Sequence, residues 1–179
     1  MIEQLPRQRV LNFLDAFYGG DTATALKYCD DEIRSMVYLP VELFPHLGPR
    51  QGKAAISELI AIHAARYSKR RFEVKFLVAD EQRAAAIIDV AFTKRTDGRV
   101  LQMPIGIFFA LRRGLVAELR SFFDTIDMIE QLTGRDLIGP LLREAGPALR
   151  PPPVEPSAVT VTGRGSSFEG RRPKVAKGG

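Results

Sequence analysis

Four apolar segments follow one another between residues 72 and 124: FEVKFLVAD (72–80), RAAAIIDVAFTKR (83–95), RVLQMPIGIFFALRR (99–113) and LVAELRSFFD (115–124). Their β-branched and aromatic residues are typical of β-strands. Short turns containing Thr96-Asp97-Gly98 and Arg113-Gly114 separate the later segments, so neighbouring strands should pair antiparallel. This stretch predicts a meander of long strands.

Helical periodicity dominates the chain before these strands. Apolar residues recur at helical spacing over residues 10–17, and Gly19-Gly20 ends that predicted helix. Asp21 is placed to cap a second, short helix. Residues 53–67 carry an apolar stripe that includes His63, which predicts a longer helix.

A strand and an unusual loop lie between these predicted helices. The segment IRSMVYLP (33–40) is strand-like, and the segment VELFPHLGPRQG (41–52) is long, apolar and broken by prolines. A loop of this length that is fully exposed to water is normally polar, and this one is apolar. We therefore expect residues 41–51 to border the mouth of a pocket.

One more helix and a tail are expected after the strands. Asp124 opens the helical segment DTIDMIEQL (124–132), and Gly134 ends it. Residues 146–179 are rich in proline, glycine and charge and hold few apolar residues, which is typical of disordered segments. We expect a folded domain over residues 1–145 and a disordered basic tail over residues 146–179.

The order of the elements predicts an α+β fold. Two helices, a strand and a longer helix precede the run of long antiparallel strands. We expect one curved, mostly antiparallel sheet wrapped around the long helix, forming a cone with an internal pocket.

Composition excludes several classes of protein. The chain is 45% hydrophobic and 26% charged, as ordinary globular proteins are. It holds no apolar run of the roughly 18 residues that a membrane helix needs, and its first residues lack the apolar core of a signal peptide. We expect a cytoplasmic protein with no membrane partner. The chain holds one cysteine, Cys29, and two histidines, which are too few for a metal site built from cysteine or histidine side chains. We expect neither a metal nor a cofactor.

The net charge of +5 is concentrated at the C-terminal end. Residues 143–179 hold seven basic and three acidic residues, hence +4, and residues 1–142 carry the remaining +1. A nearly neutral body argues against a nucleic-acid surface there. The basic tail lacks interleaved aromatic residues, so binding of an anionic polymer or membrane by the tail is the last of our hypotheses.

Three segments carry a resemblance to a known superfamily: FLDAFYGGDTATALKYCDDE (13–32), GPRQGKAAI (48–56) and LRSFFD (119–124). Together they resemble the nuclear transport factor 2-like superfamily, and more closely its SnoaL-like branch of polyketide cyclases, ketosteroid isomerases and limonene epoxide hydrolases. The resemblance covers roughly residues 5–134. It implies a conical cavity between sheet and helices, with chemistry performed by side chains that point into it, and it implies frequent dimerisation through the face that carries Phe122.

The catalytic positions of these relatives are mostly occupied by other residue types. Where the ketosteroid isomerases carry a tyrosine, a protonated acid and a general base, this sequence has Phe13, Gly106 and a site near Met36. In the comparison with the limonene epoxide hydrolases, only Asp89 is retained. The resemblance therefore supports the fold and the pocket more than either reaction.

Six residues are candidate site residues. Asp89 lies within an almost continuous apolar run, where a buried carboxylate with a raised pKa is suited to general-base work. His63 lies on the apolar stripe of the long helix and is suited to proton transfer. The predicted ligand-contacting residues are Tyr38, Gln102, Phe108 and Ser121. For each of them an ordinary structural role is the alternative.

These observations predict a protein that binds a small, largely apolar molecule, such as a polyketide-, terpenoid- or steroid-like compound. An acid/base reaction of cyclase, isomerase or hydrolase type would use Asp89 and His63. The alternative is a non-catalytic dimeric module of the same fold that binds a ligand or a protein. A homodimer is expected in either case.

Overall fold

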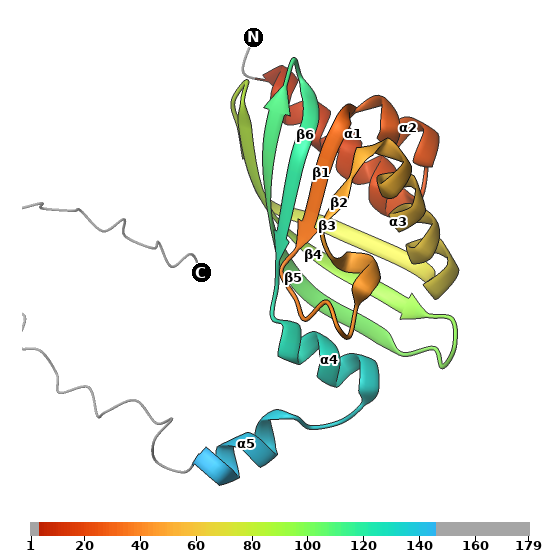
Figure 1. The fold of residues 1–179 in the computed structure, drawn as a ribbon, viewed down its shortest axis with the longest axis vertical. Coiled ribbons are helices and arrows are strands. Elements are labelled where there is room, and N and C mark those ends of the chain that lie inside the picture. The colour runs from red at the N-terminus through yellow and green to blue at the C-terminus, as the bar shows by residue number, and fades with distance from the viewer. Residues whose placement is uncertain (1–3, 146–179) are drawn as a thin grey trace, which may run out of the picture. The chain divides into compact units, whose positions relative to one another are not determined.

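The computed structural model describes residues 4–145, and the predicted elements follow in the expected order (Figure 1). The helices are α1 (Gln4–Gly19), α2 (Thr22–Lys27), α3 (Gly52–Arg66), α4 (Thr125–Thr133) and α5 (Ile138–Ala145), with a 3-10 turn η1 (Pro45–Leu47). The strands are β1 (Cys29–Val37), β2 (Arg50–Gln51), β3 (Tyr67–Ala79), β4 (Arg83–Lys94), β5 (Val100–Arg112) and β6 (Leu115–Phe122). The sequence patterns predict neither α5 nor β2. The predicted tail, 146–179, lies outside the described residues.

The six strands form one open, mixed sheet in the order β2-β1-β6-β5-β4-β3. All neighbouring strands pair antiparallel except β1 and β6, which run parallel. The α+β prediction and the mostly antiparallel pairing are confirmed. Within residues 4–145, no helix has both the length and the apolar character needed to cross a bilayer.

Helices α1 and α3 cover one face of the sheet, called here the inner face; the opposite side is the outer face (Figure 1). Side chains alternate between the two faces with a period of two residues. In β4 the buried inner side chains belong to Ala86, Ile88, Val90 and Phe92. The residues between them, Asp89 among them, therefore belong to the outer face.

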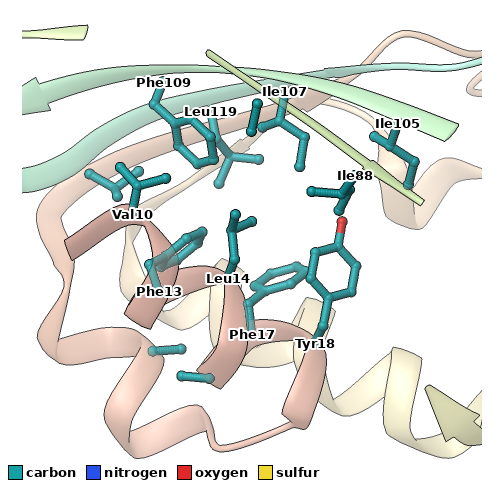
Figure 2. Close-up of a cluster of buried hydrophobic side chains, with 14 of the residues drawn as sticks. Val10, Phe13, Leu14, Phe17, Tyr18, Ile88, Ile105, Ile107, Phe109 and Leu119 are labelled. Carbon is teal, nitrogen blue, oxygen red and sulfur yellow. The ribbon is translucent and has the colours of Figure 1, made fainter. Parts of the chain in front are cut away.

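Aromatic side chains of α1 form the centre of the core. Figure 2 shows Phe13, Leu14 and Phe17 facing the inner side chains of β5 and β6. The ring of Phe13 meets the ring of Phe109 edge-on at 6.2 Å and lies 5.7 Å from the ring of Phe17. The helical periodicity seen in the sequence therefore identifies the buried face of α1 correctly.

Side-chain hydrogen bonds fix where two helices begin. Asp21 caps α2 and Asp124 caps α4, each accepting backbone N–H bonds of 3.0 Å from the first turn. Gln131 ties α4 to β5, because its side chain accepts from the backbone N–H of Gln102 at 2.7 Å and donates to the carbonyl of Gln102 at 2.8 Å. Pro104 of β5 lies beyond the point where its neighbour β6 ends. A backbone N–H at this position is therefore not needed to bond to β6, and proline is tolerated.

The end of α1 depends on a glycine and an arginine. Gly20 has a φ of 85°, in the left-handed region that favours glycine. Arg70 of β3 donates to the carbonyl of Gly19 at 3.2 Å, and its guanidinium lies where a side chain at Gly20 would begin. The turn between α1 and α2 is therefore set by Gly20 together with Arg70.

We expect Gly20→Ala to lower the free energy of unfolding by about 1–2 kcal/mol, measured by urea denaturation. An L residue is strained in the left-handed region, and the added Cβ would collide with the guanidinium of Arg70. The matched control is Gly19→Ala, because no atom lies within 4 Å of a Cβ at Gly19. The control should leave stability unchanged or raise it; equal losses in both variants would contradict this account.

Candidate functional site

A cavity of about 80 Å³ lies between α1, α3 and the inner face of the sheet. Most of its lining is apolar and comes from α1, α3, β1, β4, β5, β6 and α4, and Figure 2 shows part of this lining. The polar side chains that reach it belong to Tyr18, Ser35, His63, Tyr67 and Ser121. The arrangement is an apolar chamber with a few hydrogen-bonding groups, as small-molecule sites commonly are.

Two serines bring hydroxyls to the strand side of the cavity. Ser35 of β1 is 4% exposed and Ser121 of β6 is 7% exposed. The two strands run parallel, with Ser35 opposite Leu119 and Val37 opposite Ser121, so the serines are diagonal neighbours on the inner face. Within residues 4–145 no side-chain hydrogen bond of Ser35 or Ser121 is found, and neither hydroxyl oxygen is a fully buried atom without a partner, so each is reached from the cavity. Both are therefore available to a bound molecule.

Two tyrosines bring phenol groups to the cavity, Tyr18 from α1 and Tyr67 from the start of β3. Figure 2 shows the Tyr18 side chain reaching from α1 toward Ile88 and Ile105 on the sheet. Burial raises the pKa of Tyr18, and it also raises the pKa of Tyr67. Both phenols therefore stay protonated and uncharged at neutral pH.

His63 of α3 reaches the cavity through a group of aromatic rings. Its imidazole lies 6.0 Å from the rings of Phe17 and Phe92 and 5.9 Å from the ring of Tyr67. Burial lowers the pKa of His63 from its ordinary value of 6.5 to about 4, and nearby positive charge, including Arg70, acts in the same direction. The imidazole is therefore neutral at pH 7 and can accept a proton or a hydrogen bond.

The loop after β1 contributes to the site through Leu47 in η1, which lines the cavity. Arg50 holds this loop: its guanidinium donates to the carbonyl of His46 at 2.6 Å and pairs with Glu58 of α3 at 2.8 Å. Leu43 remains 59% exposed. The loop therefore borders the cavity at Leu47, as expected, and is anchored to α3.

Asp89 does not lie in the cavity, and the prediction that its side chain points inward is wrong. Its carboxylate is 52% exposed on the outer face and lies 3.6 Å from the ammonium of Lys75. The error concerns which residues of β4 face inward. Because side chains alternate between the two faces of a strand, a shift of one residue exchanges the inner and outer residues. Ile88 and Val90 point inward in its place.

Three predicted ligand contacts also lie outside the cavity. Tyr38 is on the outer side, where its ring stacks on Phe122 at 4.3 Å. Phe108 is 56% exposed on the outer face, and the side chain of Gln102 is exposed as well. Gln102 serves instead as the backbone attachment point of α4. Of the six predicted site residues, the structure brings His63 and Ser121 together around the cavity.

Sequence reasoning missed Ser35, Tyr18 and Tyr67 as cavity residues. A signal for Ser35 exists, because the alternation from Ile33 through Ser35 to Val37 marks one face of a strand. Tyr18 follows Phe17 directly at the end of α1, where periodicity alone does not separate core from cavity lining.

The site supplies neutral hydrogen-bonding groups and no charged side chain among the described residues that line it. Within residues 4–145, no group of three or more histidine, cysteine, aspartate or glutamate residues is arranged to hold a metal ion. The chemistry available is therefore hydrogen bonding by hydroxyls and proton acceptance by one imidazole.

Comparisons with known proteins agree with this architecture. A family model for the SnoaL-like domain matches residues 10–119. A solved structure from Rhodopseudomonas palustris, provisionally classed as an isomerase, is 27% identical, with 75% of this chain and 100% of that one covered and a TM-score of 0.65. No curated protein sequence matches the chain.

Two further solved structures share the fold. An NTF2-like protein of unknown function from Burkholderia pseudomallei is 17% identical, covers 72% of this chain and 98% of its own, and has a TM-score of 0.65. An LEH-like epoxide hydrolase from M. tuberculosis is 18% identical, covers 79% of this chain and 98% of its own, and has a TM-score of 0.59. The predicted NTF2-like fold is therefore confirmed.

We expect stability to fall as the pH drops from 6.5 to 4, by up to about 3 kcal/mol from His63. Above pH 6.5 the imidazole is neutral in both folded and unfolded chains. Below that pH the unfolded chain takes up a proton that the folded chain resists until its lowered pKa is reached. Urea denaturation at a series of pH values measures this slope.

The variant His63→Phe keeps a ring of similar size and removes the titrating group, so its stability should depend less on pH over this range. His46, on the loop, is the matched control because its imidazole is less enclosed and its pKa is also lowered by burial. His46→Phe should retain most of the slope. An unchanged slope in His63→Phe would contradict a buried neutral imidazole.

Proposed function

Because the chain belongs to the SnoaL-like domain family, we propose that it binds a small, largely apolar molecule in the cavity between α1, α3 and the sheet. The observation that carries this proposal is the pair of serine hydroxyls at the cavity, those of Ser35 and Ser121, which have no hydrogen-bond partner among the described residues. Neither oxygen is sealed off from small molecules, so both can bond to a molecule in the cavity. A ligand oxygen would bond to these hydroxyls, while the apolar lining would hold the rest of the molecule.

Relatives of similar fold support an apolar ligand. They include proteins named as a polyketide cyclase and an epoxide hydrolase. We propose polyketide-, terpenoid- or steroid-like compounds as the ligand classes for this chain.

An acid/base enzyme is the second candidate, and His63 is the observation that favours it. Its imidazole reaches the cavity in the neutral form and can take a proton from a bound molecule. None of the carboxylates within residues 4–145 lines the cavity. Ligand binding is therefore better supported than a reaction that needs paired acids.

A homodimer formed through the outer face is the proposed assembly. An apolar stripe crosses this face, and its members are 40–56% exposed. The apolar stripe consists of Tyr38, Phe76, Val78, Ile87, Phe108 and Phe122. Exposed apolar patches of this kind mark interaction sites.

The strand register makes the apolar stripe continuous. Phe76, Ile87, Gly106 and Phe122 lie opposite one another across β3, β4, β5 and β6. A Cβ at Gly106 would meet only one atom within 4 Å, the carbonyl oxygen of Phe122. The glycine therefore leaves a notch beside the Phe108 ring, and a second copy of the stripe can supply a ring to fill it.

Binding is tested with a panel of uncharged hydrophobic compounds that contain one to four rings. At least one compound should raise the thermal midpoint of the full chain, because a ligand that binds the folded state stabilises it by mass action. Ser121→Leu fills part of the cavity, so it should abolish this rise while leaving the ligand-free midpoint unchanged or higher. Ser68→Leu, on the exposed end of β3, is the matched control and should keep the response. A panel without any stabilising member would refute the proposal.

Dimerisation is tested by sedimentation of Phe108→Glu. A charge in the centre of the apolar stripe would be buried without a partner in the dimer, so this variant should be monomeric. Val100→Glu introduces the same charge at an exposed apolar position on the same strand, away from the stripe, and should leave the dimer intact. A wild-type chain that sediments as a monomer at all concentrations would overturn the assembly.

A further inference from the structure

The cavity is small because large side chains fill the space between the sheet and the helices. Phe13, Phe17, Phe109 and Phe123 all line it, and what remains is about 80 Å³. An engineered apolar cavity of about 150 Å³ is known to bind benzene. A molecule of one ring therefore already requires the lining to give way slightly, and a molecule of several rings requires it to be rebuilt.

Two methionines allow a slight adjustment. Met103 of β5 and Met128 of α4 are buried and line the cavity. Methionine side chains are unbranched and adapt to irregular gaps. Room for one ring is therefore obtained by side-chain rotation, without moving the strands.

Charge is a second restriction. The lining contains no Lys, Arg, Asp or Glu among the described residues, and its titratable members, His63 and the two tyrosines, are neutral at pH 7. An ionised ligand would lose its hydration without gaining a partner of opposite charge. The cavity therefore rejects carboxylates and ammonium groups.

The two serines are the third restriction. Ser35 and Ser121 are diagonal neighbours on adjacent strands and both line the cavity, so one bound molecule can reach both hydroxyls. One ligand oxygen placed between them can accept a hydrogen bond from one hydroxyl and, if it carries a proton, donate to the other.

We infer that the cavity takes an uncharged molecule of about one ring bearing a hydroxyl or carbonyl oxygen that Ser35 and Ser121 hold. This inference rests on the proposed function and narrows it, since it disfavours polycyclic ligands. Phenol is the simplest molecule of this class.

The probes are phenol, benzene, benzoate and 2-naphthol, titrated into the full chain labelled with ¹³C at the methionine methyl groups. Phenol should shift the methyl signals of Met103 and Met128 and leave that of Met36, which borders a groove on the outer face, in place. Benzoate should bind about 100-fold or more weakly than phenol because its charge would be buried alone. The second ring of 2-naphthol should cost about 10-fold through overpacking.

Variants of the serines test the hydrogen bonds. Ser35→Ala and Ser121→Ala should each weaken phenol about 3- to 10-fold and leave benzene unchanged, since benzene forms no hydrogen bond with them. Ser68→Ala, whose hydroxyl bonds to the carbonyl of Thr93 at the sheet edge, is the matched control and should alter neither affinity. Equal effects of the cavity variants on phenol and benzene would overturn the role of the serines.

The remaining outcomes separate this inference from the proposed function. Benzoate binding as tightly as phenol would overturn the exclusion of charge. If estradiol, which has four rings, shifts the Met103 and Met128 signals while the one-ring probes do not, the size limit is wrong and the proposed function stands. If no neutral compound shifts either signal, both are refuted.

Discussion

Packing of α1 against the inner face of the sheet is the interaction on which the rest of the domain depends. Phe13 and Phe17 extend from the helix, and Ile107 and Phe109 meet them from β5 (Figure 2). Burying each such side chain contributes about 1.5–3 kcal/mol, so this contact sets the separation of helix and sheet. The cavity is the space that these rings leave between them, and its small size follows from their bulk.

The cavity combines this apolar packing with a few polar groups that carry no charge at neutral pH. Ser35 and Ser121 are small enough to fit the inner face, and their hydroxyls lie beside the apolar lining without partners of their own among the described residues. His63 stays neutral because the surrounding rings keep water from its charged form. The same enclosure that makes the imidazole neutral makes a charged ligand unfavourable, so the protonation state of the site and its preferred ligand have one cause.

The outer face explains why sequence reasoning wrongly assigns Asp89 and Phe108 to the cavity. Ile87 and Phe108 are apolar although they lie outside, in register with the other members of the apolar stripe. With apolar residues on both faces, the period-two pattern of β4 and β5 does not identify the inner set. The apolar neighbours of Asp89 predict burial, whereas its carboxylate is half exposed and lies near Lys75.

The sequence by itself determined the order and type of the main elements, because helical and strand periods, caps and glycine stops are local. Asp21 and Asp124 as caps, Gly134 as a stop and the buried stripe of α1 all follow from short segments. It also identified His63 as a cavity residue, since a helix has one apolar stripe and His63 lies on it. Only the tertiary structure decided which face of β4 and β5 is inner, and hence that Ser35, Ser121 and Tyr18 meet around the cavity while Asp89 does not. The physical reason is that a strand with two apolar faces is oriented by what packs against it, and the helices α1 and α3 that cover the sheet come from distant parts of the chain.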